Sequence, residues 1–205
     1  MKYVKHFLKQ SIIPFIYLLL MALTSLSIGA IQGKHLVWLR LLLSVLAFGL
    51  YAVVVGAISY KEGQEAMKIR YANDIERRVI IRTGENRPLE RVKEYQTWKG
   101  FTVGLVVCIP LVIMLIVHTI LILVNPVNVG AGVLSGYVYM VWFMIFRCDL
   151  SVAVTAGTYY LVLTAIPAFA CVTGIPYYLG GRKIEIQQER ILEKQRQIYG
   201  DEYCE

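Results

Sequence analysis

Four long apolar runs separated by charged segments constrain the fold of this chain more than any other feature of its sequence. A transmembrane helix needs about 20 consecutive apolar residues to cross the hydrocarbon core of a bilayer, and each run is near or above that length. The pattern therefore predicts an all-α fold, a polytopic transmembrane helix bundle. The four runs cover residues 12–31, 36–59, 101–124 and 151–179.

The composition agrees with a membrane location. Hydrophobic residues make up 57% of the chain and the mean hydropathy is +0.57, more apolar material than the surface of a soluble protein can cover. The charged residues gather in the first nine positions, in 61–99 and in the tail from Arg182, with few between. The net charge of +7 is typical of a protein that contacts anionic headgroups. We therefore expect the lipid bilayer as a partner and no nucleic acid.

A fifth apolar run, 127–146, decides the number of spans. Lys and Arg gather on the cytoplasmic side of membrane proteins, and all but three of the 21 here lie in the N-terminus, in 61–99 or in the tail. Only an even number of spans puts these three segments on one side. We favour four full spans, with 127–146 as a re-entrant or interfacial segment on the outer side; five spans is the alternative. The prediction is a multi-pass cell-membrane protein with both termini cytoplasmic.

The first run follows three lysines, as a secretory signal would. Its apolar part is about twice the usual length of such a signal, and Ile28 stands where a cleavage site needs a small residue. We interpret it as an uncleaved first helix, with a cleaved signal as the alternative.

The two longer charged segments have the periodicity of amphipathic helices. We predict 61–99 as a cytoplasmic loop with a helix at 64–82, and 181–205 as a cytoplasmic helical tail. Their apolar stripes predict packing on each other or on headgroups; the alternative is contact with a second copy of the chain or a membrane-complex partner through 64–82 and 184–198. The stripes consist of Met67, Tyr71, Ile75 and Val79, and of Ile184, Ile191 and Ile198.

Small residues predict that the helices approach one another closely. Pairs spaced by four residues occur in several segments, as at interfaces between transmembrane helices. A faint internal repeat accompanies them, because the second span ends Ser59-Tyr60-Lys61-Glu62-Gly63 and the last ends Tyr177-Tyr178-Leu179-Gly180-Gly181. The pairs are Ala52 and Gly56, Gly100 and Gly104, Gly132 and Gly136, and Ala153 and Gly157.

A few ionisable residues lie within or beside the apolar runs, where charge is costly and often functional. In the four-span topology Arg40, His118, Arg147 and Asp149 reach the same outer level of the membrane. They could together bind a phosphate or carboxylate, with Tyr159 and Tyr160 as further ligand-binding candidates. The simpler interpretation is that Arg40 lies at outer headgroups and that Arg147 and Asp149 form an ordinary turn at the water interface. His118, Tyr159 and Tyr160 would then hydrogen-bond to neighbouring helices.

No catalytic or nucleotide-binding motif occurs in the sequence, and its four cysteines lack the spacing of a metal site. We therefore expect no cofactor, no metal and, most simply, no enzymatic activity. The leading hypothesis is a small non-enzymatic protein that transports or senses an anionic or lipid-like ligand at the outer side. The alternatives are a structural or accessory subunit of a membrane complex and, third, intramembrane catalysis by His118 and Asp149.

Overall fold

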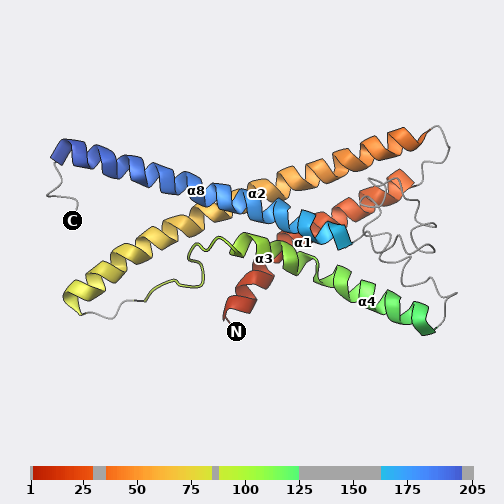
Figure 1. Cartoon of the computed structure of the whole chain (residues 1–205), viewed down its shortest axis with the longest axis horizontal. Coiled ribbons are helices and arrows are strands. Elements are labelled where there is room, and N and C mark those ends of the chain that lie inside the picture. Colours follow the sequence, from red (N-terminus) through yellow and green to blue (C-terminus); the bar gives the residue numbers. More distant parts are fainter. Residues whose placement is uncertain (1, 30–35, 85–87, 125–162, 200–205) are drawn as a thin grey trace.

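The computed structural model describes residues 2–29, 36–84, 88–124 and 163–199. Every regular element in these ranges is helical (Figure 1). The all-α prediction is thus confirmed for the described part of the chain. The helices are α1 (Lys2–Gly29), α2 (Val37–Thr83), α3 (Lys99–Val107), α4 (Ile109–Val124) and α8 (Ala165–Tyr199).

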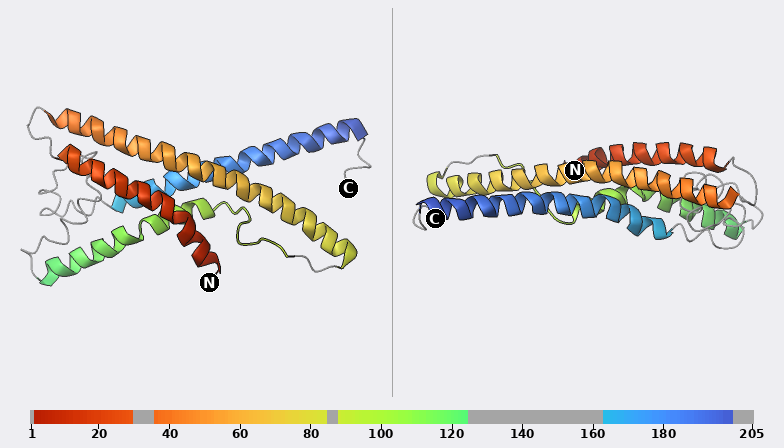
Figure 2. Two further views of the ribbon diagram at one scale, coloured as in Figure 1. Left: turned by 180° about the vertical axis from the view of Figure 1, so that it is seen from behind. Right: turned by 90° about the horizontal axis from the view of Figure 1, so that it is seen from above.

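Two long helices, α2 and α8, cross as an X and run in the same direction (Figure 1). At one end of the molecule α1, α3 and α4 accompany them, whereas at the other end their C-terminal parts diverge (Figures 1 and 2). We name these parts the α2 arm (64–83) and the α8 arm (181–199). The N-terminus of α1 lies near the middle of the molecule, beside the crossing (Figure 2).

Helix α2 is continuous from the second apolar run into the charged segment, so the predicted helix at 64–82 is its second half rather than a separate element. Its 47 residues extend over about 70 Å, more than twice the hydrocarbon thickness of a bilayer. Only the apolar part, 37–59, fits within a membrane. The helix ends at Thr83, where Gly84 adopts a left-handed φ of 71° and donates its N–H to the Ile80 carbonyl.

Two of the described helices, α1 and α2, are long and apolar enough to cross a membrane. A third span results if α3 and α4, which meet at an angle of 44°, are counted as one. Many apolar side chains of these helices point outward. Leu50 and Val53 of α2, for example, are 68% and 70% exposed. This supports a membrane location, while the four-span count stays a prediction because 125–162, which holds the fifth apolar run and the start of the last one, lies outside the described residues.

The bend between α3 and α4 has a cause in the sequence. Pro110 has no N–H to donate to the Val106 carbonyl, and its ring crowds that carbonyl. The helix therefore breaks at Cys108, one residue before α4 begins, and α4 diverges from α1.

The apolar core lies in the part of the molecule where α1, α3 and α4 accompany the two long helices, which we name the apolar half. It takes side chains from all five helices. Phe169 of α8 is its largest fully buried residue and packs edge-on against Tyr51 and Phe48 of α2, with ring centroids 5.3 and 5.9 Å apart. A smaller cluster near the crossing joins Met67, Tyr95 and Ile184. Ile191 and Ile198, further along the predicted α8 stripe, are exposed.

The crossing of α2 and α8 depends on one glycine from each helix. A Cβ at Gly63 would overlap the carbonyl of Tyr177, and a Cβ at Gly180 would overlap the carbonyl of Tyr60. The two contacts are therefore reciprocal. In each of them a glycine meets a tyrosine that stands three positions before the glycine of the other helix. The Hα atoms of the glycines point at these oxygens, as in weak Cα–H···O bonds. The two segments of the faint repeat are those that meet here.

We predict that Gly63→Ala and Gly180→Ala each destabilise the protein by about 2 kcal/mol or more, because an added methyl group cannot be accommodated without separating the backbones. Gly49→Ala, in α2 like Gly63, is the matched control, since a Cβ there meets nothing within 4 Å. The control should be neutral or stabilising by up to about 1 kcal/mol, the helix-propensity difference. Thermal unfolding in detergent followed by circular dichroism measures all three, and equal melting temperatures would contradict the close crossing.

Candidate functional site at the charged end

The structure does not bring the six predicted ligand-binding residues together within its described part. Arg40 lies half-buried in the first turn of α2, and His118 lies in α4. The other four, Arg147, Asp149, Tyr159 and Tyr160, lie outside the described residues. Their convergence on one outer pocket stays a prediction. The described polar side chains concentrate instead at the opposite end of the apolar core, around the crossing, which we name the charged end.

A buried lysine holds the segment 88–98 against the bundle at this end. Lys99, the first residue of α3, is only 2% exposed. Its Nζ donates to the carbonyl oxygens of Val92, at 2.7 Å, and Glu94, at 2.5 Å. Two hydrogen bonds from a charged donor compensate the cost of burying an ammonium group and satisfy two carbonyls of an irregular segment. Lys99 thereby fixes the conformation of the chain that leads into α3.

The same segment is tied to the α2 arm by an ion-pair network. Arg77 donates to both carboxylate oxygens of Glu94, at 2.8 and 3.0 Å, and to Asp74 at 2.7 Å. Both bonds to Glu94 come from Nη2, and the Glu94 side chain is 14% exposed, so this ion pair is partly shielded from water. The backbone N–H of Tyr95 also donates to the Ala66 carbonyl at 3.1 Å. The 88–98 segment thus contacts α2 along about three turns.

Two tyrosines connect this segment to α8. The rings of Tyr95 and Tyr177 are stacked, with centroids 5.3 Å apart and an angle of 5° between their planes. Tyr177 is also the residue whose carbonyl contacts Gly63. The 88–98 segment therefore packs directly on the crossing.

A small polar cavity of about 130 Å³ lies beside the crossing, between α1, α2 and α8. Its lining includes carboxylates from α2 and basic groups from other elements. The glutamates are Glu62 and Glu65, and the basic groups are Lys93, Lys99 and His6. Gln10 of α1 and Tyr177 of α8 complete its polar lining.

Glu62 is the residue of this cavity that is best placed to exchange a proton. It lies beyond the apolar part of α2, between the exposed Lys61 and the glycine of the crossing. Burial raises the pKa of Glu62 to about 7, and the nearby Glu65 carboxylate adds to the effect. A carboxyl with this pKa changes its charge near neutral pH.

Comparison with models of protein families, with curated proteins and with solved structures finds no match to this chain. Function must therefore be argued from the site itself.

The site can change its charge near neutral pH. Among the described residues, no group of three or more His, Cys, Asp and Glu side chains could hold a metal ion. A carboxyl that titrates near pH 7 beside two lysines can change the local charge without a cofactor. Because Glu62 precedes Gly63, any such change occurs where the two long helices touch.

Sequence reasoning did not find this site. The 61–99 segment has many charges, and the sequence offers no sign of which of them are buried. The one available signal was the repeat that ends in Gly63 and Gly180, because helices that touch through glycines bring their neighbouring side chains together as well. Glu62 lies inside that repeat.

We predict that Glu62 makes the stability of the protein depend on pH between 5 and 8. Its pKa rises from 4.5 to about 7 on folding, so in this range the folded state binds more protons than the unfolded state. Stability contributed by the protonated form is therefore lost as pH rises through 7. Glu62→Gln should remove the decrease and stabilise the protein at pH 8, by on the order of 2 kcal/mol.

The control for this prediction is Glu193→Gln, which removes an exposed carboxylate from the α8 arm. Thermal unfolding in detergent at pH 5, 6, 7 and 8 provides the comparison. A wild-type protein whose melting temperature follows the same pH profile as Glu62→Gln would exclude the raised pKa.

Proposed function

We propose that this chain is a non-enzymatic membrane protein that senses or transports an anionic or lipid-like ligand at the outer side and passes the change to its cytoplasmic arms. The observation that carries the proposal is the course of α2. One unbroken helix joins the apolar half to the charged half and touches α8 through backbone atoms at a single crossing. In such an arrangement a tilt of one helix about the crossing moves its two ends in opposite directions, as in a lever.

The lever lengths are comparable on the two sides of the crossing. Gly63 lies 26 residues from Val37 and 20 residues from Thr83, or about 39 and about 30 Å along the helix. A tilt that moves the start of α2 by about 4 Å therefore moves the end of its arm by about 3 Å in the opposite direction. Arg40, a proposed ligand residue, lies at the far end of this lever.

The proposed topology has four spans, with 127–146 as an outer re-entrant or interfacial segment and with both termini and both arms in the cytoplasm. The distribution of Lys and Arg supports it, as does the parallel direction of α2 and α8 (Figure 1). Two parallel helices that both leave the apolar half at the crossing put both arms on one side of the membrane.

An accessory subunit is the second candidate, and the arms favour it. Apolar residues on the arms become exposed beyond the crossing: Ile75 and Ile81 are 64% and 82% exposed on α2, and Ile198 is 71% exposed on α8. Within 64–82 and 184–198, the part of each stripe beyond the buried Met67 and Ile184 is thus available for a membrane-complex partner or a second copy of the chain. In this function the crossing would hold the two arms at a fixed separation.

The topology is tested by labelling single cysteines from outside intact cells. Reporters replace Gly33, Asn128, Asp149 and Glu205 in a chain without native cysteines. We expect an impermeant maleimide to label the first three and to spare the fourth until the cells are opened. A labelled Glu205→Cys would mean an odd number of spans and would place Asp149 on the inner side, which removes the outer ligand site.

Coupling is tested by measuring the distance between the arms. Spin labels at Ile81→Cys and Ile198→Cys in nanodiscs report this distance by pulsed electron paramagnetic resonance. We expect Arg40→Gln to shift the distance distribution by several ångströms, because it perturbs the far end of the α2 lever. Leu50→Ala, an exposed residue in the same helix, is the control and should leave it unchanged. Identical distributions for all three proteins would contradict the lever and favour the accessory subunit.

A further inference from the structure

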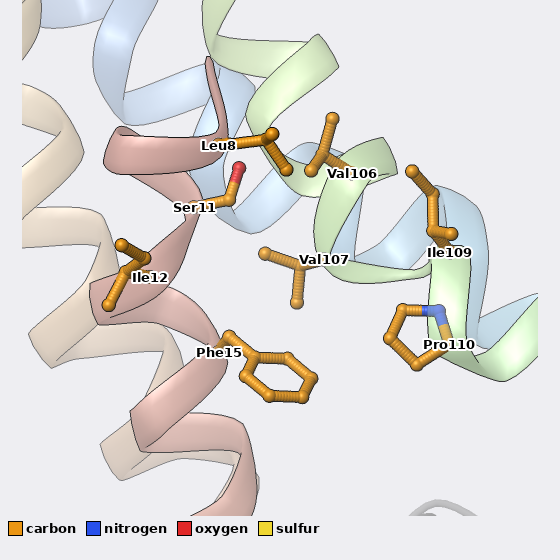
Figure 3. Close-up of a pocket in the computed structure, with 8 residues that line it drawn as sticks. All are labelled: Leu8, Ser11, Ile12, Phe15, Val106, Val107, Ile109 and Pro110. Atoms are coloured by element: carbon orange, nitrogen blue, oxygen red, sulfur yellow. The ribbon is translucent and has the colours of Figure 1, made fainter. Parts of the chain in front are cut away.

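An apolar groove opens between α1 and the bent pair of α3 and α4. Its volume is about 250 Å³. Phe15 points across it toward Pro110, and Leu8, Val106 and Ile109 form much of the remaining lining (Figure 3). The groove exists because α4 turns away from α1 at Cys108. It lies within the apolar half of the molecule.

The groove offers little hydrogen bonding to a polar ligand. Ser11 contributes the only side-chain polar atom among the eight residues that line it. That hydroxyl already donates to the Phe7 carbonyl at 2.8 Å and lies 3.5 Å from the Val103 carbonyl. The groove therefore fits a hydrocarbon chain.

A second, larger pocket of about 630 Å³ lies on the other side of the contact between α1 and α3, at the charged end. Three arginines and two carboxylates line it, which leaves one positive charge in excess. Arg77 is already bonded to both carboxylates, so the excess belongs to Arg70 and Arg91. This charge is complementary to an anion.

Neutral polar groups in the same pocket add to its capacity for a headgroup. Tyr3 and Trp98 also line it, and both are typical of the headgroup level of a bilayer. The side-chain oxygen of Gln96 is buried there and has no hydrogen-bond partner within the described residues. A buried polar atom without a partner is costly and favours a ligand or water that can satisfy it.

Both pockets are lined by the N-terminal part of α1, on faces of the helix about 140° apart. Tyr3 lines the charged pocket and Leu8 lines the apolar groove, a separation of about 7.5 Å along the helix. The Phe7 ring contacts the half-exposed Trp98 ring between them, with centroids 5.7 Å apart. A ligand with an anionic group at one end and hydrocarbon at the other could follow this aromatic contact from one pocket to the other.

We propose that these two pockets form a binding site for one anionic phospholipid of the leaflet at the charged end. The phosphate lies against Arg70 and Arg91, and an acyl chain lies in the groove between α1 and the bent pair of helices. A free phosphate would use only the first pocket, and the apolar groove beside it favours the lipid. This site is separate from the outer ligand site of the proposed function and does not depend on it.

The test measures lipid binding to the purified full chain by native mass spectrometry and by the rise in melting temperature in detergent. The probes are phosphatidylglycerol, phosphatidylcholine with the same acyl chains, and soluble glycerol phosphate. We expect phosphatidylglycerol to bind at least tenfold more tightly than phosphatidylcholine, and glycerol phosphate at the same concentration not to compete. Equal binding of the two lipids would overturn the proposal, and effective competition by glycerol phosphate would assign the site to a free anion.

Two pairs of variants test the two pockets separately. The double variant Arg70→Gln, Arg91→Gln should weaken phosphatidylglycerol binding about thirtyfold, since each arginine contributes about 1 kcal/mol. The control, Arg78→Gln with Arg190→Gln, removes the same charge from exposed positions outside the pocket. Ile109→Trp fills the groove and should weaken binding of both lipids, whereas Ile113→Trp, one turn further along α4, should not. Indistinguishable affinities within either pair would overturn the proposal for that pocket.

Discussion

The close contacts of Gly63 with the Tyr177 backbone and of Gly180 with the Tyr60 backbone are the constraint on which the rest of the described structure depends. A helix backbone can approach another this closely only where a glycine leaves room for it, so these two glycines fix where α2 and α8 cross. Every other element at the charged end is positioned relative to that point. Gly100 and Gly104 of α3 pack against α8 in a similar way, with Tyr177 and Thr173 as neighbours. The bundle is thus assembled around α8 through glycine contacts.

This close approach explains why polar groups are buried beside the crossing. Helices that approach closely leave little room for water, and a side chain next to a contact glycine is partly enclosed by the neighbouring elements. Glu62 is in this position and Lys99 is next to it in the same cavity. Lys99 is satisfied by two carbonyls, whereas the Glu62 carboxyl shares its surroundings with Glu65. The two carbonyls therefore offset part of the cost of burying the Lys99 ammonium group, whereas burial and Glu65 both disfavour the charged form of Glu62.

The sequence predicted the helical fold and the membrane location because both depend on long-range averages of hydropathy, which the apolar runs display directly. It also predicted close packing at Gly56, Gly100 and Gly104. It did not predict that α2 would continue unbroken through Lys61, because a change from apolar to charged residues alters the environment of a helix without ending it. The charged pocket was missed because its members, such as Arg70 and Arg91, are brought together only by the fold of 88–98.

The bend at Cys108 connects the apolar half to the charged end, and a hydropathy profile does not reveal it. If α3 and α4 were one straight helix, α4 would remain beside α1 and the groove would close. The bend follows from Pro110, which removes one backbone hydrogen bond from an otherwise regular helix. An occupant of the groove would contact both α1 and α4, and α1 in turn packs on α2. Lipid in this groove would therefore affect the position of α2 relative to α8, and with it the separation of the arms.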